Sequence, residues 1–83
     1  MEQNTTQTSR VSSYLTVDDL KRAATYLHDY ITNGYKLIGK LIEATKASFV
    51  LRHRRNGARL TLTLHHKKIE IYRNHKLRKT EEF

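Results

Sequence analysis

With 83 residues, the chain is long enough for one small domain, which would bury only about 60% of the surface of its unfolded chain. It contains no Cys, which excludes disulfides and Cys-ligated metal sites, and it has no Trp or Pro. It shows no apolar run of about 18 residues and no secretory signal segment. These features predict a soluble, cytoplasmic protein whose small core would gain from association with copies of itself.

The charge is unevenly distributed along the chain. Sixteen Lys and Arg against eight Asp and Glu give a formal net charge of +8. Between Arg52 and Lys79, ten Lys and Arg accompany one acid, Glu70. Such a basic segment holds counterions that a polyanion can displace, which indicates a nucleic acid as partner. An acidic protein or a membrane surface is the alternative, the membrane being disfavoured because the basic residues lie in strand-like sequence.

The first ordered element is expected to be a short helix. Thr16 is a suitable N-cap, and Asp18 and Asp19 follow in the first turn, where the helix dipole stabilises acidic side chains. This pattern predicts a helix over about residues 17–24. The next segment, residues 25–32, is rich in Thr, Tyr and Ile and precedes an Asn-Gly turn, so we expect a first strand there. The helix could instead continue to Tyr30, because apolar residues extend its period.

The remaining strands follow from turn signals and alternation. Residues 33–51 fit a helix or two strands by periodicity alone, but the Asn-Gly turn and Gly39 favour a bent strand over residues 35–44 and a second over 47–54. A hairpin turn at Arg55-Asn56-Gly57-Ala58 leads to a strand that alternates Leu with polar residues. This strand is expected at residues 59–64, and the last strand of the chain at residues 68–73.

Both ends of the chain are expected to lie outside the folded domain. Residues 1–15 are rich in Thr, Ser, Gln and Asn, which predicts a disordered N-terminal arm. Residues 74–83 are charged and predict a flexible C-terminal tail. The folded domain is then residues 16–73.

The predicted fold class is mostly β: an N-terminal α-helix followed by a strongly bent five-stranded antiparallel sheet. A meander of this size must curl into a small open barrel, with the helix capping one end. The strands at 59–64 and 68–73 would be left as edges. Pairing of these edges between subunits would form a head-to-tail ring.

The segment from Thr16 to Leu51, which contains Asn33-Gly34-Tyr35-Lys36-Leu37, Gly39 and Leu41, resembles Hfq, the bacterial Sm-like RNA chaperone. The motif N-G-x-x-L-x-G lies in a matching frame of elements, and the likeness resumes loosely from His65 to Tyr72. The resemblance implies an Sm-like fold in a divergent member of the family. It also implies a homohexameric ring that binds single-stranded RNA, meaning small regulatory RNA and mRNA, in post-transcriptional regulation.

The resemblance places a distal-face site for A-rich RNA around the Asn-Gly turn. Tyrosine rings beside the turn can stack unpaired bases, and glycine allows their close approach, although both rings could instead pack in the core or at a subunit interface. The matching residues are Tyr30, Asn33, Gly34, Tyr35, Lys36 and Leu37.

A second, proximal or pore-side site is implied at Lys46, His65, His66 and Lys67. Residues 64–69 read Leu-His-His-Lys-Lys-Ile where Hfq proteins have Y-K-H-A-I-S. In addition, Thr45 stands where the family has Asp, and Ala47 replaces the aromatic residue that stacks uridine, so weak binding of U-rich RNA is expected. Adjacent histidines point to opposite faces of a strand, so at most one per subunit would line a pore, and both could be solvated edge residues.

Two helix residues, Lys21 and Arg22, match part of the basic rim patch of the family, although Ala23 and Ala24 replace two further basic positions. Such a pair is also common on solvated helix surfaces. The sequence shows no metal-ligand cluster, no nucleophile with a paired base and no phosphate-binding Gly loop. We therefore expect no metal, no cofactor and no catalytic residue, and the chain is not predicted to be an enzyme.

Two other functions remain open. The ring could act as a protein-interaction hub without RNA binding, because the pore aromatic is missing. The chain could also be a winged-helix-like DNA-binding protein, with residues 35–46 as recognition helix and residues 54–57 as wing tip. Secondary structure separates this last alternative from the ring.

Overall fold

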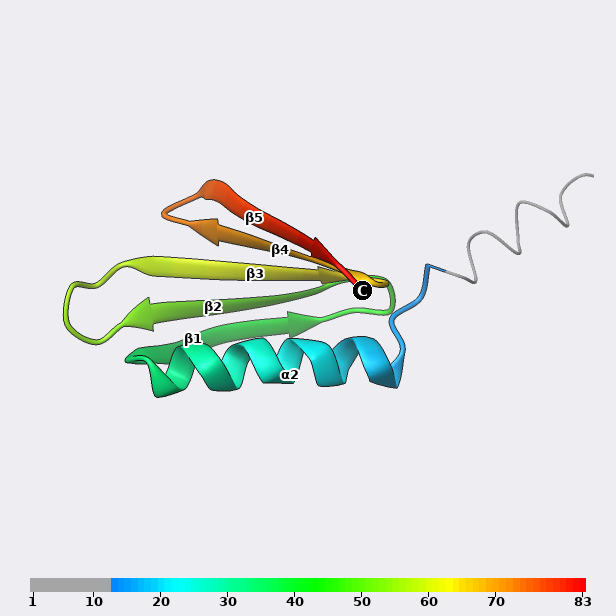
Figure 1. Cartoon of the computed structure of the whole chain (residues 1–83), viewed down its shortest axis with the longest axis horizontal. Coiled ribbons are helices and arrows are strands. Elements are labelled where there is room, and N and C mark those ends of the chain that lie inside the picture. Colours follow the sequence, from blue (N-terminus) through cyan, green and yellow to red (C-terminus); the bar gives the residue numbers. More distant parts are fainter. Residues whose placement is uncertain (1–12) are drawn as a thin grey trace, which may run out of the picture.

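The computed structural model describes residues 13–83, in which one helix precedes five antiparallel strands (Figure 1). The strands hydrogen-bond in sequence order, β1-β2-β3-β4-β5, as an open meander. The predicted fold class of one helix and a five-stranded antiparallel sheet is confirmed. The sheet does not close, so β1 and β5 are its edges. The elements are α2 (Val17–Thr32), β1 (Tyr35–Ile42), β2 (Ala47–His53), β3 (Arg59–His65), β4 (Lys68–Arg73) and β5 (Lys76–Glu82).

The helix begins where the sequence predicts and ends later. Thr16 forms a capping box with Asp19, in which each side chain accepts from the backbone N–H of the other residue. The predicted strand at residues 25–32 is wrong, because α2 continues to Thr32. One face of this extension carries Tyr26, Leu27 and Tyr30, which pack against the core together with the buried Ala23. Burial of this face outweighs the β-propensity of the individual residues.

The core lies between the helix and one face of the sheet. Alternate residues of the three central strands point into it, as the pattern of residues 59–64 predicted, and their cross-strand partners lie on the same face. The helix contributes Ala23 as its one buried apolar residue, together with the buried acid Asp19. The buried strand residues are Ala47, Phe49, Leu51, Leu60, Leu62, Leu64, Ile69 and Ile71.

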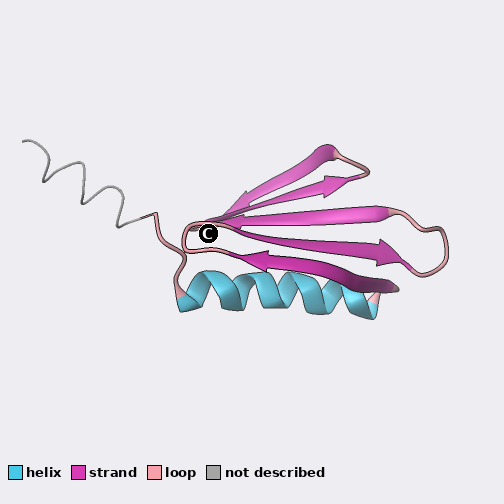
Figure 2. Ribbon diagram, turned by 180° about the vertical axis from the view of Figure 1, so that it is seen from behind, coloured by secondary structure: helices cyan, strands magenta, loops and turns pink. Residues whose placement is uncertain are grey.

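The edge strand β1 contains the irregularity expected near its glycine. The register with β2 shifts between Leu37 and Gly39, so Ile38 is an extra residue on the β1 side. Figure 2 shows the helix running beside β1, with the β4–β5 hairpin at the other edge of the sheet. No helix in residues 13–83 is long and apolar enough to cross a membrane.

The C-terminal segment is a strand and not the predicted flexible tail. Residues 76–82 pair with β4 along its whole length. The connecting residues Asn74 and His75 have φ angles of 51° and 72°, as a two-residue type I′ hairpin turn requires. Because β4 pairs with both β3 and β5, the predicted edge strands at 59–64 and 68–73 are interior, and a ring contact between them is ruled out.

The predicted N-terminal arm lies mostly outside the described residues, which begin at Ser13. Within the described residues, the backbone N–H of Leu15 donates to the carbonyl of Ala44 at 2.9 Å, and the Leu15 side chain packs against the core. This contact attaches the chain before the helix to the loop between β1 and β2.

The carboxylate of Asp19 joins the start of the helix to the turn between β3 and β4. It is 1% exposed and accepts from the backbone N–H of Lys67 at 3.1 Å, and it lies 2.9 Å from His66 Nδ1. Burial alone raises the pKa of this carboxyl. The hydrogen bonds from His66, from the Thr16 and Lys67 backbone and from the Thr16 side chain outweigh burial and lower the pKa of Asp19 to about 2.

We predict that Asp19→Asn lowers the free energy of unfolding at pH 7 by about 2 to 3 kcal/mol, because the single amide oxygen of Asn cannot replace both carboxylate oxygens as acceptor for the Thr16 N–H, the Lys67 N–H and His66 Nδ1. The lowered folded-state pKa contributes stability above pH 4, and this contribution of about 2 kcal/mol is lost as pH falls towards 2. Urea unfolding between pH 2 and 7 measures both effects. The exposed Asp29→Asn is the control, and equal acid sensitivity of the wild type and Asp19→Asn would contradict the assignment.

Candidate nucleic-acid interface

The outer face of the sheet, opposite the core, is not covered by any element in the described part of the chain. The side chains on it alternate with the core residues along each strand. Most of them are polar or basic, and they are half-buried or exposed. This face is therefore open to a ligand.

Three cations lie in one row across three neighbouring strands of the outer face. Lys36 of β1 is directly opposite Arg52 of β2, and Arg52 is directly opposite Arg59 of β3. None of the three forms an ion pair with another described residue. Like charges directly opposite each other destabilise a sheet, so an anion bound along this row would relieve a repulsion built into the fold.

The basic row continues into the two turns at the same end of the sheet. The β2–β3 loop contributes Arg54 and Arg55, and the β4–β5 turn lies beside Arg59 because Asn74 Oδ1 accepts from the Arg59 backbone N–H at 3.1 Å. Residues 52–59 and 73–79 contain no Asp or Glu. The two turns at this end of the sheet, which we call the basic end, therefore add positive charge and no acid.

A groove runs along the outer sides of β3 and β4, beside the basic row. Its lining mixes hydroxyls, one lysine, two histidines, one carboxylate and one phenol ring: Lys46, Thr61, Thr63, His65, Glu70, Tyr72 and His75. Glu70 Oε1 lies 3.1 Å from His65 Nε2 and accepts from the Tyr72 hydroxyl at 3.4 Å. The Tyr72 side chain is therefore directed along β4 towards Glu70. Aromatic rings on an open sheet face are platforms on which unpaired bases stack.

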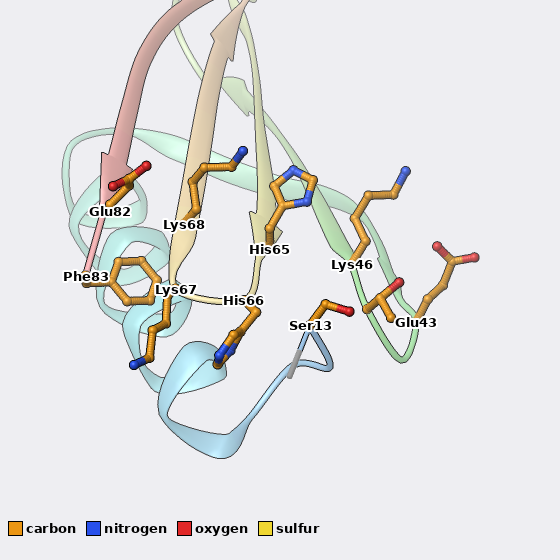
Figure 3. Close-up of a pocket in the computed structure, with 10 residues that line it drawn as sticks. Ser13, Glu43, Lys46, His65, His66, Lys67, Lys68, Glu82 and Phe83 are labelled. Carbon is orange, nitrogen blue, oxygen red and sulfur yellow. The ribbon is translucent and has the colours of Figure 1, made fainter. Parts of the chain in front are cut away.

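The predicted pore residues Lys46, His65, His66 and Lys67 do gather around one pocket, at the end of the sheet opposite the basic end (Figure 3). As expected, the two histidines point in different directions: His65 towards Glu70 on the outer face, and His66 towards Asp19 at the start of the helix. The pocket also includes Glu43 and Glu82, so its charge is mixed.

The predicted distal-face residues are divided between the core and the surface. Tyr30 lies on the helix rather than at the end of a strand, and its ring packs edge-on against Tyr35 with centroids 5.6 Å apart. The Tyr35 ring also meets His53 edge-on at 4.8 Å. Burial, with smaller contributions from Tyr35 and Asp29, raises the pKa of Tyr30. The two rings therefore contact each other within one chain and leave no slot for a base between them.

The other distal-face residues have structural contacts, with one exception. Asn33 caps the helix through its side-chain amide, which donates to the Asp29 carbonyl. Gly34 has a φ of 101°, and a Cβ there would lie 3.0 Å from His53 Nε2. Leu37 packs against the core. Lys36 alone lies on the open face, in the cation row.

The predicted rim residues lie on the exposed side of the helix. Arg22 Nε is 3.8 Å from Asp18, and its guanidinium lies over the Phe83 ring at 5.0 Å from the centroid. Lys21 lines a shallow surface hollow with it. Among residues 13–83, no three potential ligands are grouped as a metal site requires.

No protein-family model, curated protein or solved structure matches the chain. The sequence did not reveal the cation row or the presence of Tyr72 in the groove. It also did not reveal that Glu70 lies beside His65 and Asp19 beside His66. Alternation along single strands placed these residues opposite the apolar face, but only the register between strands brings them together.

The repulsion in the cation row predicts a variant that gains stability. Arg52→Glu should raise the free energy of unfolding by about 0.5 to 1 kcal/mol at low salt, because Glu would pair with both Lys36 and Arg59. The gain should shrink in high salt. Urea unfolding at low and high salt measures it, with Lys21→Glu on the helix as control. A loss of stability in Arg52→Glu would show that the row is not strained.

Proposed function

We propose that the chain is a single-stranded RNA-binding protein that uses the outer face of its sheet. The observation that carries this proposal is the unpaired row Lys36–Arg52–Arg59, which is placed to contact successive phosphates. The basic end extends the phosphate path, and the groove beside it offers an aromatic ring to the bases. The resemblance to Hfq favours RNA and a role in post-transcriptional regulation in the cytoplasm.

The outer face replaces the distal face as the principal site in this proposal. Tyr30 and Tyr35 pack against each other and the core, which leaves little ring surface for a base. The pocket with Lys46, His65 and Lys67 is a secondary phosphate contact, since its two acids reduce its positive charge. A helix inserted into a DNA groove is not part of the proposal, because residues 35–46 form β1 and its following loop.

Salt dependence of RNA affinity tests the proposal. For single strands, each phosphate contact contributes about 0.7 to the slope of log affinity against log salt, so Arg52→Gln should lower both affinity and slope for every sequence. Fluorescence anisotropy with a labelled 12-mer over a range of NaCl concentrations measures this. Lys40→Gln is the matched control, because Lys40 is exposed and is paired across β1 and β2 with the core residue Phe49, so it does not lie on the outer face. If both variants behave like the wild type, the outer face does not bind RNA.

We further propose that copies of the chain associate through the free edges of the sheet, as the ring of Hfq-like proteins implies. The β1 edge carries exposed Ile38, Leu41 and Ile42, which water solvates poorly and which a second copy would cover. Unpaired strand edges favour such pairing. The outer face stays open in this arrangement because the contact is made edge to edge.

Light scattering at micromolar concentration is expected to show an oligomer for the wild type. The double variant Leu41→Lys/Ile42→Lys should be monomeric, because it places charges on the covered edge. Ile31→Lys, at another exposed apolar position, on the helix, should leave the mass unchanged. A monomeric wild-type chain would refute edge association while leaving the RNA proposal untouched.

A further inference from the structure

Glu70 is in an unexpected position for a surface that binds phosphates. It is the one acid between Arg52 and Lys79, and it lies inside the groove of the outer face. Its side chain is 22% exposed. A carboxylate at this place repels a phosphate backbone, so a role in backbone binding would not explain it. A carboxylate can instead accept hydrogen bonds from the edge of a base.

The hydrogen-bond geometry leaves part of the Glu70 carboxylate available. Oε1 is occupied by His65 Nε2 and the Tyr72 hydroxyl, at 3.1 and 3.4 Å. Among the described residues, none donates a hydrogen bond to Oε2. The contacts at Oε1 hold the carboxylate in one orientation, and each oxygen can accept more than one hydrogen bond.

Tyr72 places a stacked base next to this carboxylate. Its hydroxyl points at Glu70, so the carboxylate lies just beyond the hydroxyl end of the ring. A purine stacked over the ring would present its hydrogen-bonding edge at the same point. Thr63 is directly opposite Glu70 on β3 and supplies a hydroxyl that can donate to a neighbouring base oxygen.

The donor pattern of the four bases then selects one of them. Guanine presents two adjacent donors, N1–H and N2–H, on its Watson–Crick edge, and a carboxylate accepts both. Adenine and cytosine each place an acceptor beside their amino group, and uracil places acceptors on both sides of its single donor. An acceptor facing a carboxylate is repelled, so guanine alone matches Glu70 with two hydrogen bonds.

We propose that the groove formed by Thr61, Thr63, His65, Glu70 and Tyr72 is a guanine-reading pocket in single-stranded RNA. The proposal rests on the proposed RNA-binding function and adds base selectivity to it. Tyr72 stacks the base, Glu70 accepts from N1–H and N2–H, and Lys46 and His75 at the groove's two ends contact the flanking phosphates. The cation row then carries the strand away from the pocket towards the basic end.

The test compares three labelled 9-mers, oligo-A with guanosine, inosine or adenosine at the centre, binding to the wild-type protein in one buffer. Inosine lacks the N2 amino group but keeps N1–H and O6. Guanosine is expected to bind roughly tenfold tighter than adenosine, with inosine between them. Because this comparison uses the unaltered protein, its result does not depend on whether any variant folds.

Two variants assign the effect to residues. Glu70→Gln should remove the preference for guanosine over inosine while leaving the salt slope unchanged. Asp29→Asn, which changes an exposed acid of the helix outside the groove, is its control. Tyr72→Ala should weaken all three 9-mers by about tenfold or more. Tyr72→Phe keeps the ring but removes the hydrogen bond to Glu70 Oε1, so it should retain the stacking affinity and lose part of the preference for guanosine.

The outcomes separate the two proposals. Equal affinity for the three 9-mers, together with a slope that Arg52→Gln reduces, would overturn the guanine pocket and leave RNA binding intact. A guanosine preference that survives in Glu70→Gln would mean that Glu70 only orients His65. Failure of all three 9-mers to bind would overturn both proposals.

Discussion

The buried carboxylate of Asp19 is the contact on which the arrangement of helix and sheet depends. It caps the helix through Thr16 and at the same time accepts from the β3–β4 turn through Lys67 and His66. A buried charge is costly unless every oxygen is hydrogen-bonded, and here the surrounding donors lower the pKa of Asp19 despite burial. The helix start therefore has one position relative to the sheet.

With its start held in this way, the helix covers one face of the sheet and leaves the other open. Ala23 has a small side chain that lets the helix approach closely, and Tyr30 further along the helix packs against Tyr35 of β1. The same packing that completes a small core leaves Tyr30 and Tyr35 only half exposed, with their rings turned edge-on against each other. The stability of the core and the exposure of rings for base stacking thus compete for these two residues.

The open face gathers groups that do not stabilise the sheet by themselves. Lys36, Arg52 and Arg59 repel one another across neighbouring strands, and the basic turns add charge at the same end. Glu70 and Tyr72 lie beside them in a groove. Such a combination of unpaired cations, an aromatic ring and one oriented carboxylate is typical of a surface completed by a ligand, and it supports the proposed RNA interface.

The sequence by itself determined the start of the helix, the strands β2, β3 and β4 with their buried Leu and Ile residues, and the basic character of the C-terminal half. Local capping and strict alternation specify these features without long-range information. Only the tertiary structure decided that residues 25–32 are helical, because their burial against the sheet outweighs β-propensity. It also decided that residues 76–82 form a strand, since this depends on pairing with β4 after a turn of two positive-φ residues. The candidate site depended most on the tertiary structure. Lys36, Arg52 and Arg59 are separated in the sequence, and the register between neighbouring strands places them in one row. This register is not encoded in any single strand.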